Sequence, residues 1–260
     1  MAASRALTDW IGFKTIIIRE FSRIVRIWGQ TIVPPAVTAT LYFVIFGSLI
    51  GRRVGQVGGY DYMHFMAPGI IMMNVIQTSY GNVVSSFFGA KFGKHIEELL
   101  VSPLPNWLIV TGYVMGGVLR GVLVGSVVTI ISLFFTHLSI THVLAIVTAA
   151  FLTSFIFALG GFINALFAKN FDQISWFPTF VLTPLTYLGG VFYSVTMLPG
   201  WAHAASHANP ILYMVSAFRF GFLGVSDVDL RLAYGIMVFA AAAMFTLAVA
   251  LLNRGTGIRD

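Results

Sequence analysis

The residues whose types could support chemistry do not form a catalytic motif. Residues 89–94 resemble a phosphate-binding loop, but one residue is missing between the two glycines. His95 then stands where such a loop needs a hydroxyl group that binds Mg²⁺. His203 and His207 are four residues apart and could share a helix face, yet no third metal ligand follows nearby. The sequence therefore predicts no ATP site, no metal site and no cofactor in this chain.

A group of charged and apolar side chains lies between two long apolar runs, at about 88–102. Its apolar members would form one ridge of a short helix, which Pro103 ends, with acidic residues beside the ridge. An exposed apolar ridge is suited to a protein partner, and packing on the protein's own helices is the alternative. The predicted contact residues are Lys91, Lys94, Ile96, Glu97, Glu98, Leu99 and Leu100.

Arg120 lies within a long apolar run. It follows Pro105 by fifteen residues, which corresponds to about 22 Å along a helix. No acidic residue occurs inside the predicted spans, so its partner must be a carbonyl group, water, the interface or an anionic substrate group. Gly117, Gly121 and Gly125 form a small-residue stripe on the same helix, which favours close helix packing.

The composition indicates that lipid is the solvent around these elements. Of the 260 residues, 58% are hydrophobic and 9% are charged, against roughly 25% charged residues in soluble domains. The absence of cysteine excludes disulfides and thiolate sites. The net charge of +6 is interpreted as a topology signal, without a nucleic-acid partner. We therefore expect one all-α integral membrane domain over residues 1–260.

Charge-free runs of the length of a bilayer predict six transmembrane helices and no β-barrel. Residues 137–142 carry two histidines and two hydroxyl residues, and they predict the loop between the third and fourth helices. Pro199 and Pro210 predict turns around a half-length segment at about 199–225, which is re-entrant or interfacial. The six predicted spans are 28–50, 62–86, 106–135, 143–167, 175–197 and 231–253.

The first 26 residues predict an amphipathic helix in the membrane interface, at about 5–26. Its apolar face would carry Trp10, Phe13, Ile17, Phe21, Ile24 and Trp28. Its charged residues Arg19, Glu20 and Arg23 would contact lipid headgroups or a protein partner; a passive anchor is the alternative. With the N-terminus in the cytoplasm, ten Lys and Arg residues lie on that side and four on the other, Arg120 set aside. Both termini are therefore expected in the cytoplasm.

The fifth predicted helix and the segment after it are similar to the motif of the ABC-2 type transporter permeases. The strings PTFVLTPLTYLGGVFY at 178–193 and IEELLVSPLP at 96–105 resemble more narrowly the YadH-like inner-membrane permeases of bacteria. The resemblance extends from RIWGQTIVPP at 26–35 to the C-terminal arginines. The residues that match the family motif are Leu182, Leu185, Leu188, Gly189, Val191, Leu198, Pro199, Pro210, Ile211, Tyr213 and Arg219.

This resemblance implies an elbow helix at the N-terminus, a coupling helix after the second span and a re-entrant segment before the sixth. It also implies a permease homodimer in the bacterial inner membrane, served by two copies of a separate ATPase subunit that holds the ATP and Mg²⁺. Such a permease would export a hydrophobic or amphipathic substrate: a drug, a lipid or a lipid-linked saccharide. The candidates for the translocation pathway are Arg120, Pro184, Tyr187 and Phe192.

Two other classes of function stay open. A non-transporting membrane scaffold would need the same apolar helices. A membrane-embedded enzyme that modifies lipids would use His64, His137, His142, His203 and Glu97, although no known motif joins them.

The charge bias gives a first testable prediction. A reporter fused after Asp260 and one inserted within residues 91–95 should report the same side of the membrane, because both positions are predicted to be cytoplasmic. A reporter within residues 137–142 should report the other side. If the first two reporters disagree, the predicted topology is wrong.

Overall fold

The computed structural model describes the backbone of residues 2–257, and all their side chains except those of residues 2–6, 48, 49, 52, 97, 100 and 196. The first half contains α1 (Ala2–Arg26), α2 (Trp28–Tyr42), the π-helix η1 (Phe43–Ile50), α3 (Gly51–Val54), β1 (Gln56–Val57), β2 (Tyr60–Asp61), α4 (Tyr62–Phe92), α5 (His95–Val101) and α6 (Asn106–Ser132). The second half contains α7 (Val143–Phe167), α8 (Phe171–Phe177), the π-helix η2 (Pro178–Leu182), α9 (Thr183–Leu188), the 3₁₀ helix η3 (Val195–Met197), α10 (Gly200–His207), α11 (Pro210–Leu223) and α12 (Leu230–Asn253).

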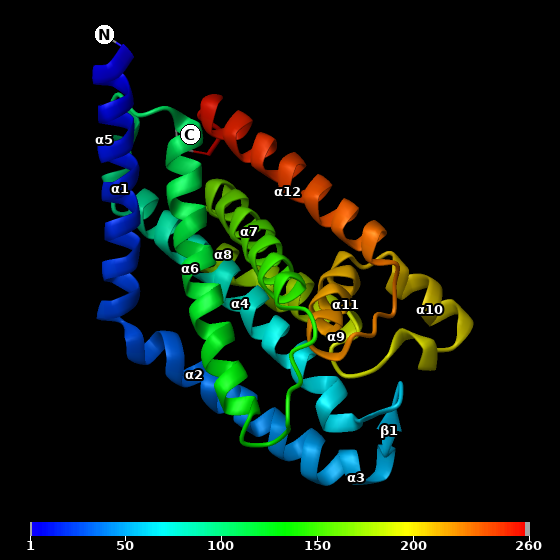
Figure 1. Ribbon diagram of the computed structural model, residues 1–260. Helices are drawn as coiled ribbons and strands as arrows, with labels where there is room; N and C mark the ends of the chain where they lie inside the picture. The colour runs from blue at the N-terminus through cyan, green and yellow to red at the C-terminus, as the bar shows by residue number, and fades with distance from the viewer. Residues whose placement is uncertain (1, 258–260) are drawn as a thin grey trace.

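Helix α4 is the centre of the bundle, and it packs most extensively against α7 and α6 (Figure 1). It is 31 residues long, and most of its side chains are buried, including the polar Asn74, Ser79 and Asn82. The glycines of α6 make this contact possible: a Cβ on Gly117 would meet Val83 and the carbonyl oxygen of Ser79. The predicted packing role of the glycine stripe is therefore confirmed.

Four helices in the described part of the chain are long and apolar enough to cross a membrane: Trp28–Gly47, Asn106–Ser132, Val143–Phe167 and Leu230–Asn253. They correspond to the first, third, fourth and sixth predicted spans. Helix α4 is long enough but less apolar, and the number of six spans stays a prediction.

The fifth predicted span, 175–197, is wrong at its C-terminal boundary. Helical structure runs from α8 through η2 into α9 and ends at Leu188, nine residues early. The cause is the pair Gly189 and Gly190, because Gly190 has a positive φ of 74° and turns the chain away.

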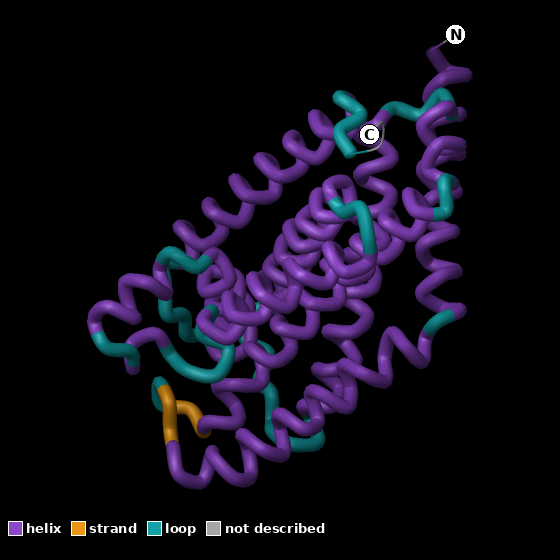
Figure 2. Tube along the Cα trace, turned by 180° about the vertical axis from the view of Figure 1, so that it is seen from behind, coloured by secondary structure: helices purple, strands orange, loops and turns teal. Residues whose placement is uncertain are grey.

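The segment predicted at 199–225 is a pair of short helices, α10 and α11. Figure 2 shows that the two strands are confined to a single hairpin, in which Gln56 pairs with Asp61 and Val57 with Tyr60. The sequence did not predict this hairpin, since its strands are only two residues long. The first turn of α1 and the last turn of α12 lie at the same end of the bundle as α5, as the predicted topology requires (Figure 1).

The contact between α7 and α4 can be tested at two adjacent glycines. A Cβ on Gly161 would lie 2.5 Å from the carbonyl oxygen of Tyr80 and 3.2 Å from the amide nitrogen of Val84. Because backbone cannot move aside as a side chain can, Gly161→Ala should lower the free energy of unfolding by about 1–3 kcal/mol. Thermal unfolding of the purified protein in one detergent measures this.

Gly160→Ala is the matched control, since its Cβ would meet nothing closer than 3.6 Å. Both variants gain the same helix propensity from alanine, so their difference isolates the helix contact. Equal melting temperatures for the two variants would contradict the close approach of α7 and α4.

Candidate functional site

The short helix α5 (His95–Val101) joins the end of α4 to the start of α6. Lys94 has a φ of 60° in the left-handed region, and it turns the chain between α4 and α5. The helix predicted at 88–102 is therefore shorter at both ends, because residues 88–92 belong to α4. The short helix α5 therefore lies close against the end of α4.

The predicted apolar ridge of this helix points partly inward, which corrects its assignment. Ile96 is 2% exposed and packs in the hydrophobic core, and Leu99 is half-buried against that core. The side chains of Glu97 and Leu100 lie outside the described residues. The outward side chains are those of Phe92, Lys94, Glu98 and Val101, which we call the coupling surface. Ile96 turned inward because α5 is short and lies against α4.

Lys91 links the coupling segment to α7 instead of facing outward. Its Nζ donates to the carbonyl oxygens of Leu166 at 2.7 Å, of Ala168 at 2.8 Å and of Ala165 at 3.5 Å. These carbonyls end α7, where helix carbonyls have no partner in their own helix and favour a positive charge. The prediction that Lys91 contacts a partner is therefore replaced by an internal role.

Helix α1 packs lengthwise on the first half of α6. Ile16 and Glu20 of α1 lie against Gly112 and Gly116 of α6, and a Cβ on Gly116 would come within 2.8 Å of Glu20. The predicted apolar face is split: Ile24 is buried, whereas Trp10, Phe21 and Trp28 are exposed. This differs from the prediction because the packed face is centred on Ile16, Glu20 and Ile24.

Two charged residues of α1 turn into the protein. Glu20 is 1% exposed, and its carboxylate accepts from Arg23 Nη2 at 3.0 Å and from the Ser86 hydroxyl. Arg23 also donates to Asn82 Oδ1 at 2.7 Å. The prediction that Glu20 faces headgroups or a partner is wrong, because its pairing with Arg23 permits burial. Arg23 is partly exposed, and its contact with headgroups or a partner stays a prediction. Arg19 remains exposed, as predicted.

Arg120 belongs to the same cluster. Its Nη1 lies 3.5 Å from Asn82 Oδ1, and the charges of Glu20 and Arg23 both act on it. It therefore lies beside the last turns of α1, level with the start of the span Trp28–Gly47. Arg120 is the fifteenth residue of the candidate span Asn106–Ser132, and its predicted depth of about 22 Å along the helix stays a prediction.

The other pathway candidates form a separate aromatic cluster between α2 and α9. The hydroxyl groups of Tyr42 and Tyr187 are 2.6 Å apart. The ring of Phe192 stacks on Phe46 at 4.9 Å and on Tyr187 at 5.6 Å between centroids. Pro184 is exposed near the start of α9. Sequence reasoning missed Tyr42 and Phe46, although their spacing of four residues on an apolar helix is a usable signal.

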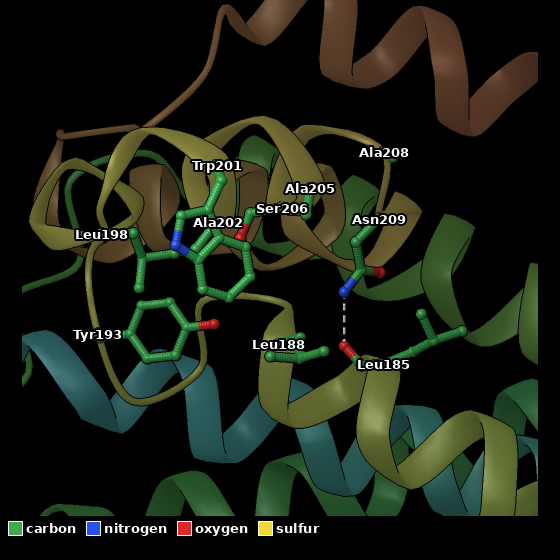
Figure 3. A pocket seen from close by; sticks show the side chains of 10 residues that line it. All are labelled: Leu185, Leu188, Tyr193, Leu198, Trp201, Ala202, Ala205, Ser206, Ala208 and Asn209. Atoms are coloured by element: carbon green, nitrogen blue, oxygen red, sulfur yellow. Dashed lines mark hydrogen bonds between the residues drawn. The ribbon is translucent and has the colours of Figure 1, made fainter.

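The residues of the family motif gather where α9 meets the pair α10–α11. Asn209 Nδ2 donates to the carbonyl oxygen of Leu185 at 2.6 Å, as the dashed line in Figure 3 marks. Gly189 leaves room for Ile211, and the Tyr213 hydroxyl donates to the carbonyl of His207 at 2.8 Å. Leu182 and Val191 are buried. Leu198 is half-buried and lines a cavity of about 250 Å³ together with Leu188. Pro199 directly precedes α10, and Pro210 begins α11.

Arg219, the last residue of this motif, is fully buried, and both of its terminal nitrogens are bound. Its Nη1 lies 3.0 Å from Asp227 Oδ2, and its Nη2 donates to the carbonyl of Gly190 at 2.6 Å. Its guanidinium carbon lies 3.9 Å from the ring centre of Phe65. The Ser194 hydroxyl holds the other oxygen of Asp227 at 2.6 Å. Sequence reasoning counted Arg219 as a surface cation and missed Asp227.

Comparison with known proteins agrees with this arrangement. The family description "ABC-2 type transporter" matches residues 11–223. The chain belongs to the ABC-2 type transporter family. It is 53% identical over 251 residues to the "Inner membrane transport permease YadH" of Escherichia coli (strain K12), covering 96% of this chain and 98% of that protein.

More distant relatives of this ABC-2 permease include two proteins named "Nodulation protein J". The one from Rhizobium leguminosarum bv. trifolii is 27% identical over 218 residues, covering 82% of each chain. The one from Sinorhizobium fredii is 26% identical over 216 residues, covering 83% of this chain and 82% of the relative. The permease is thus a multi-pass inner-membrane protein.

The ionisable side chains of the permease do not gather into a metal centre. The rings of His203 and His207 are 4.6 Å apart between centroids, but no group of three or more potential ligands occurs among the described residues. His64 lies near Ser139, and His142 packs on Phe220. His137 lies close enough to His64 for their charges to interact, whereas His142 and His203 lie apart from this pair, so these histidines form no single site.

The buried ion pair of the ABC-2 permease gives a prediction on stability. Asp227→Asn leaves the buried Arg219 guanidinium without its counter-charge, so the free energy of unfolding should fall by about 3–5 kcal/mol. Thermal unfolding in detergent measures the change. Asp229→Asn is the control: Asp229 caps α12 from an exposed position, and asparagine caps as well. Parent-like unfolding of Asp227→Asn would contradict the role of the pair.

Proposed function

We propose that this chain is the permease subunit of an ATP-binding cassette exporter that moves a hydrophobic or amphipathic substrate across the inner membrane. A separate ATPase subunit supplies the energy, in two copies per permease homodimer, and holds the ATP and Mg²⁺. Family membership supports the transport role. The name of the Escherichia coli relative, an inner membrane transport permease, supports the location.

The observation that carries the proposal is the attachment of α5. Its coupling surface exposes the apolar Val101, which is 87% exposed, and Phe92, together with one charge of each sign, on Lys94 and Glu98. A surface of this kind is suited to an apolar groove with charged residues at its rim. Because Lys91 joins this end of α4 to the end of α7, a displacement of α5 would act on two central helices together.

The face formed by α2 and α9 is the proposed place for the second permease copy and for the pathway between the copies. It exposes large apolar side chains, among them Val37, Leu41 and Phe180. The same face carries the Tyr42 and Tyr187 hydroxyl pair, polar groups that a lipid-facing surface does not need. We assign the pathway to Pro184, Tyr187 and Phe192. Arg120 lies in the α1 cluster, and its pathway role stays a prediction.

The composition of the pathway face indicates the class of substrate. The pathway face combines aromatic rings with two hydroxyl groups, a lining that suits an amphipathic molecule, and drugs, lipids and lipid-linked saccharides all have that character. The proposed orientation keeps both termini and α5 on the cytoplasmic side, where the ATPase would bind.

The coupling surface gives the decisive test. Val101→Asp adds a charge to the apolar part of the surface, so copurification of the ATPase and substrate-stimulated ATP hydrolysis should each fall at least about tenfold. Membrane insertion should be unchanged, because Val101 touches solvent and not the core. Pull-down from membranes and ATP hydrolysis in proteoliposomes measure the two effects.

Val143→Asp is the matched control. Val143 is 63% exposed and begins α7 at the opposite end of the bundle. It should leave ATPase binding as in the parent. Normal stimulated hydrolysis with Val101→Asp would refute the proposed docking, and ATPase binding with no transport of any amphipathic substrate would favour the scaffold alternative.

A further inference from the structure

The cluster around Arg120 carries one more positive than negative charge. It holds two guanidinium groups, on Arg23 and Arg120, but one carboxylate, on Glu20. Both oxygens of that carboxylate are already bound, by Arg23 and Ser86. Asn82 Oδ1 accepts from Arg23 at 2.7 Å and from Arg120 at 3.5 Å, so the hydrogen bond from Arg120 is the weaker of the two.

Three buried donors in the cluster are also unsatisfied. Arg23 Nε, Arg120 Nε and Asn82 Nδ2 are buried and have no hydrogen-bond partner among the described residues. Asn82 itself is fully buried. Buried donors without acceptors are costly, and their position beside an unneutralised arginine indicates that an acceptor belongs there.

An apolar groove lies directly beside this cluster, between α1 and α6. It has a volume of about 280 Å³ and is lined by Phe21, Ile24, Val118, Leu119, Val122 and Leu123. Phe21 and Leu119 are 52% and 39% exposed, so the groove is open to the surroundings of the bundle. Leu123 of this lining lies one helical turn after Arg120, so the groove and the cation are neighbours on α6.

Lipid can reach the cluster from the side of α1. Arg23 and Asn82 tie Arg120 to the last turns of α1, and the candidate span Trp28–Gly47 begins directly after them. The outward face of α1 exposes the apolar Leu7, Ile18 and Val25 beside the basic Lys14 and Arg19, a combination typical of a helix in the membrane interface. The phosphate of a lipid beside α1 would therefore meet the guanidinium while its acyl chain extends along the groove.

We propose that the groove between α1 and α6 is a binding site for an anionic phospholipid of the bilayer, with its phosphate on Arg120 and one acyl chain against Phe21, Ile24 and Leu119. Arg120 supplies a planar donor fork that matches two phosphate oxygens. The bound lipid completes the charge balance of the cluster and seals α1 to α6. This site does not depend on the proposed transport function, since its occupant is a resident lipid.

A second groove on the same helix shows what the first one adds. It has a volume of about 250 Å³, lies between α4, α6 and α7, and includes Val147 and Phe151 in its lining. Neither groove has a charged residue in its lining, but only the first lies one helical turn from Arg120, at Leu123. A groove of similar size without a cation should accept acyl chains of any lipid and show no preference for an anionic one.

The test uses the full-length protein, purified in mild detergent and titrated with phosphatidylglycerol or phosphatidylcholine in native mass spectrometry. The parent should prefer phosphatidylglycerol. Arg120→Met should weaken phosphatidylglycerol binding about tenfold or more, because it removes a hydrogen-bonded charge, and should leave phosphatidylcholine binding unchanged. Arg120→Lys should retain part of the preference.

Filling the groove separates binding from folding. Leu119→Trp keeps Arg120 but occupies the groove, so it should also lose the preference; Val147→Trp fills the uncharged groove and should keep it. Arg231→Met, at an exposed arginine elsewhere, should keep it as well. If folded Arg120→Met and Leu119→Trp proteins both bind phosphatidylglycerol as the parent does, the site is refuted. If the parent protein shows this lipid preference but transports no amphipathic substrate, the transport proposal alone is contradicted.

Discussion

The close packing of a polar helix in the centre of the bundle is the constraint on which this structure depends. Helix α4 carries asparagine, serine and tyrosine side chains that lipid would not accept, so it has to be enclosed by protein. Enclosure requires neighbours without side chains at the contact, and Gly117, Gly121 and Gly161 provide them from α6 and α7. The apolar surfaces of α7 and α12 are then free to face the bilayer.

Both ends of this central helix are fixed by polar ties of different kinds. At the α5 end, Lys91 holds the carbonyls of α7. At the other end, Tyr62 donates to the carbonyl of Phe192, and Phe65 lies under the buried Arg219. A rigid element with fixed ends transmits displacement well, which suits a helix between an energy source and a pathway.

Much of the fold was predictable because lipid imposes a simple rule on length and charge. Four spans and the half-length segment at about 199–225 follow from apolar runs and prolines, and the loop at 137–142 follows from its polar residues, although α6 ends at Ser132, three residues earlier than predicted. The orientation of individual side chains did not follow. Periodicity shows which residues share a helix face, but it does not show which face packs against the rest of the protein. Ile96 and Glu20 were therefore both expected at the surface, and both are buried.

The partners of charged residues were hidden for a related reason. Asp227 follows Arg219 by eight residues across a turn, and Asn82 is far from Arg120 in the chain. A hydropathy profile scores each residue separately, whereas a charged side chain can be buried only when a partner of opposite charge or a hydrogen-bonding group lies beside it. Likewise, the hydroxyl contact between Tyr42 and Tyr187 depends on two helices that meet only in the folded chain.

The two π-helical segments set the angular phase of that tyrosine contact. Tyr42 directly precedes η1, and Tyr187 follows η2, where the backbone and the hydroxyl of Thr183 both donate to the carbonyl of Pro178, five residues earlier. A π turn holds an extra residue within an otherwise α-helical path, and one residue rotates a helix by about 100°. Loss of one residue from either segment would swing one phenol ring to another side of its helix. The two hydroxyl groups would then no longer meet, although every side chain of the aromatic cluster would still be present.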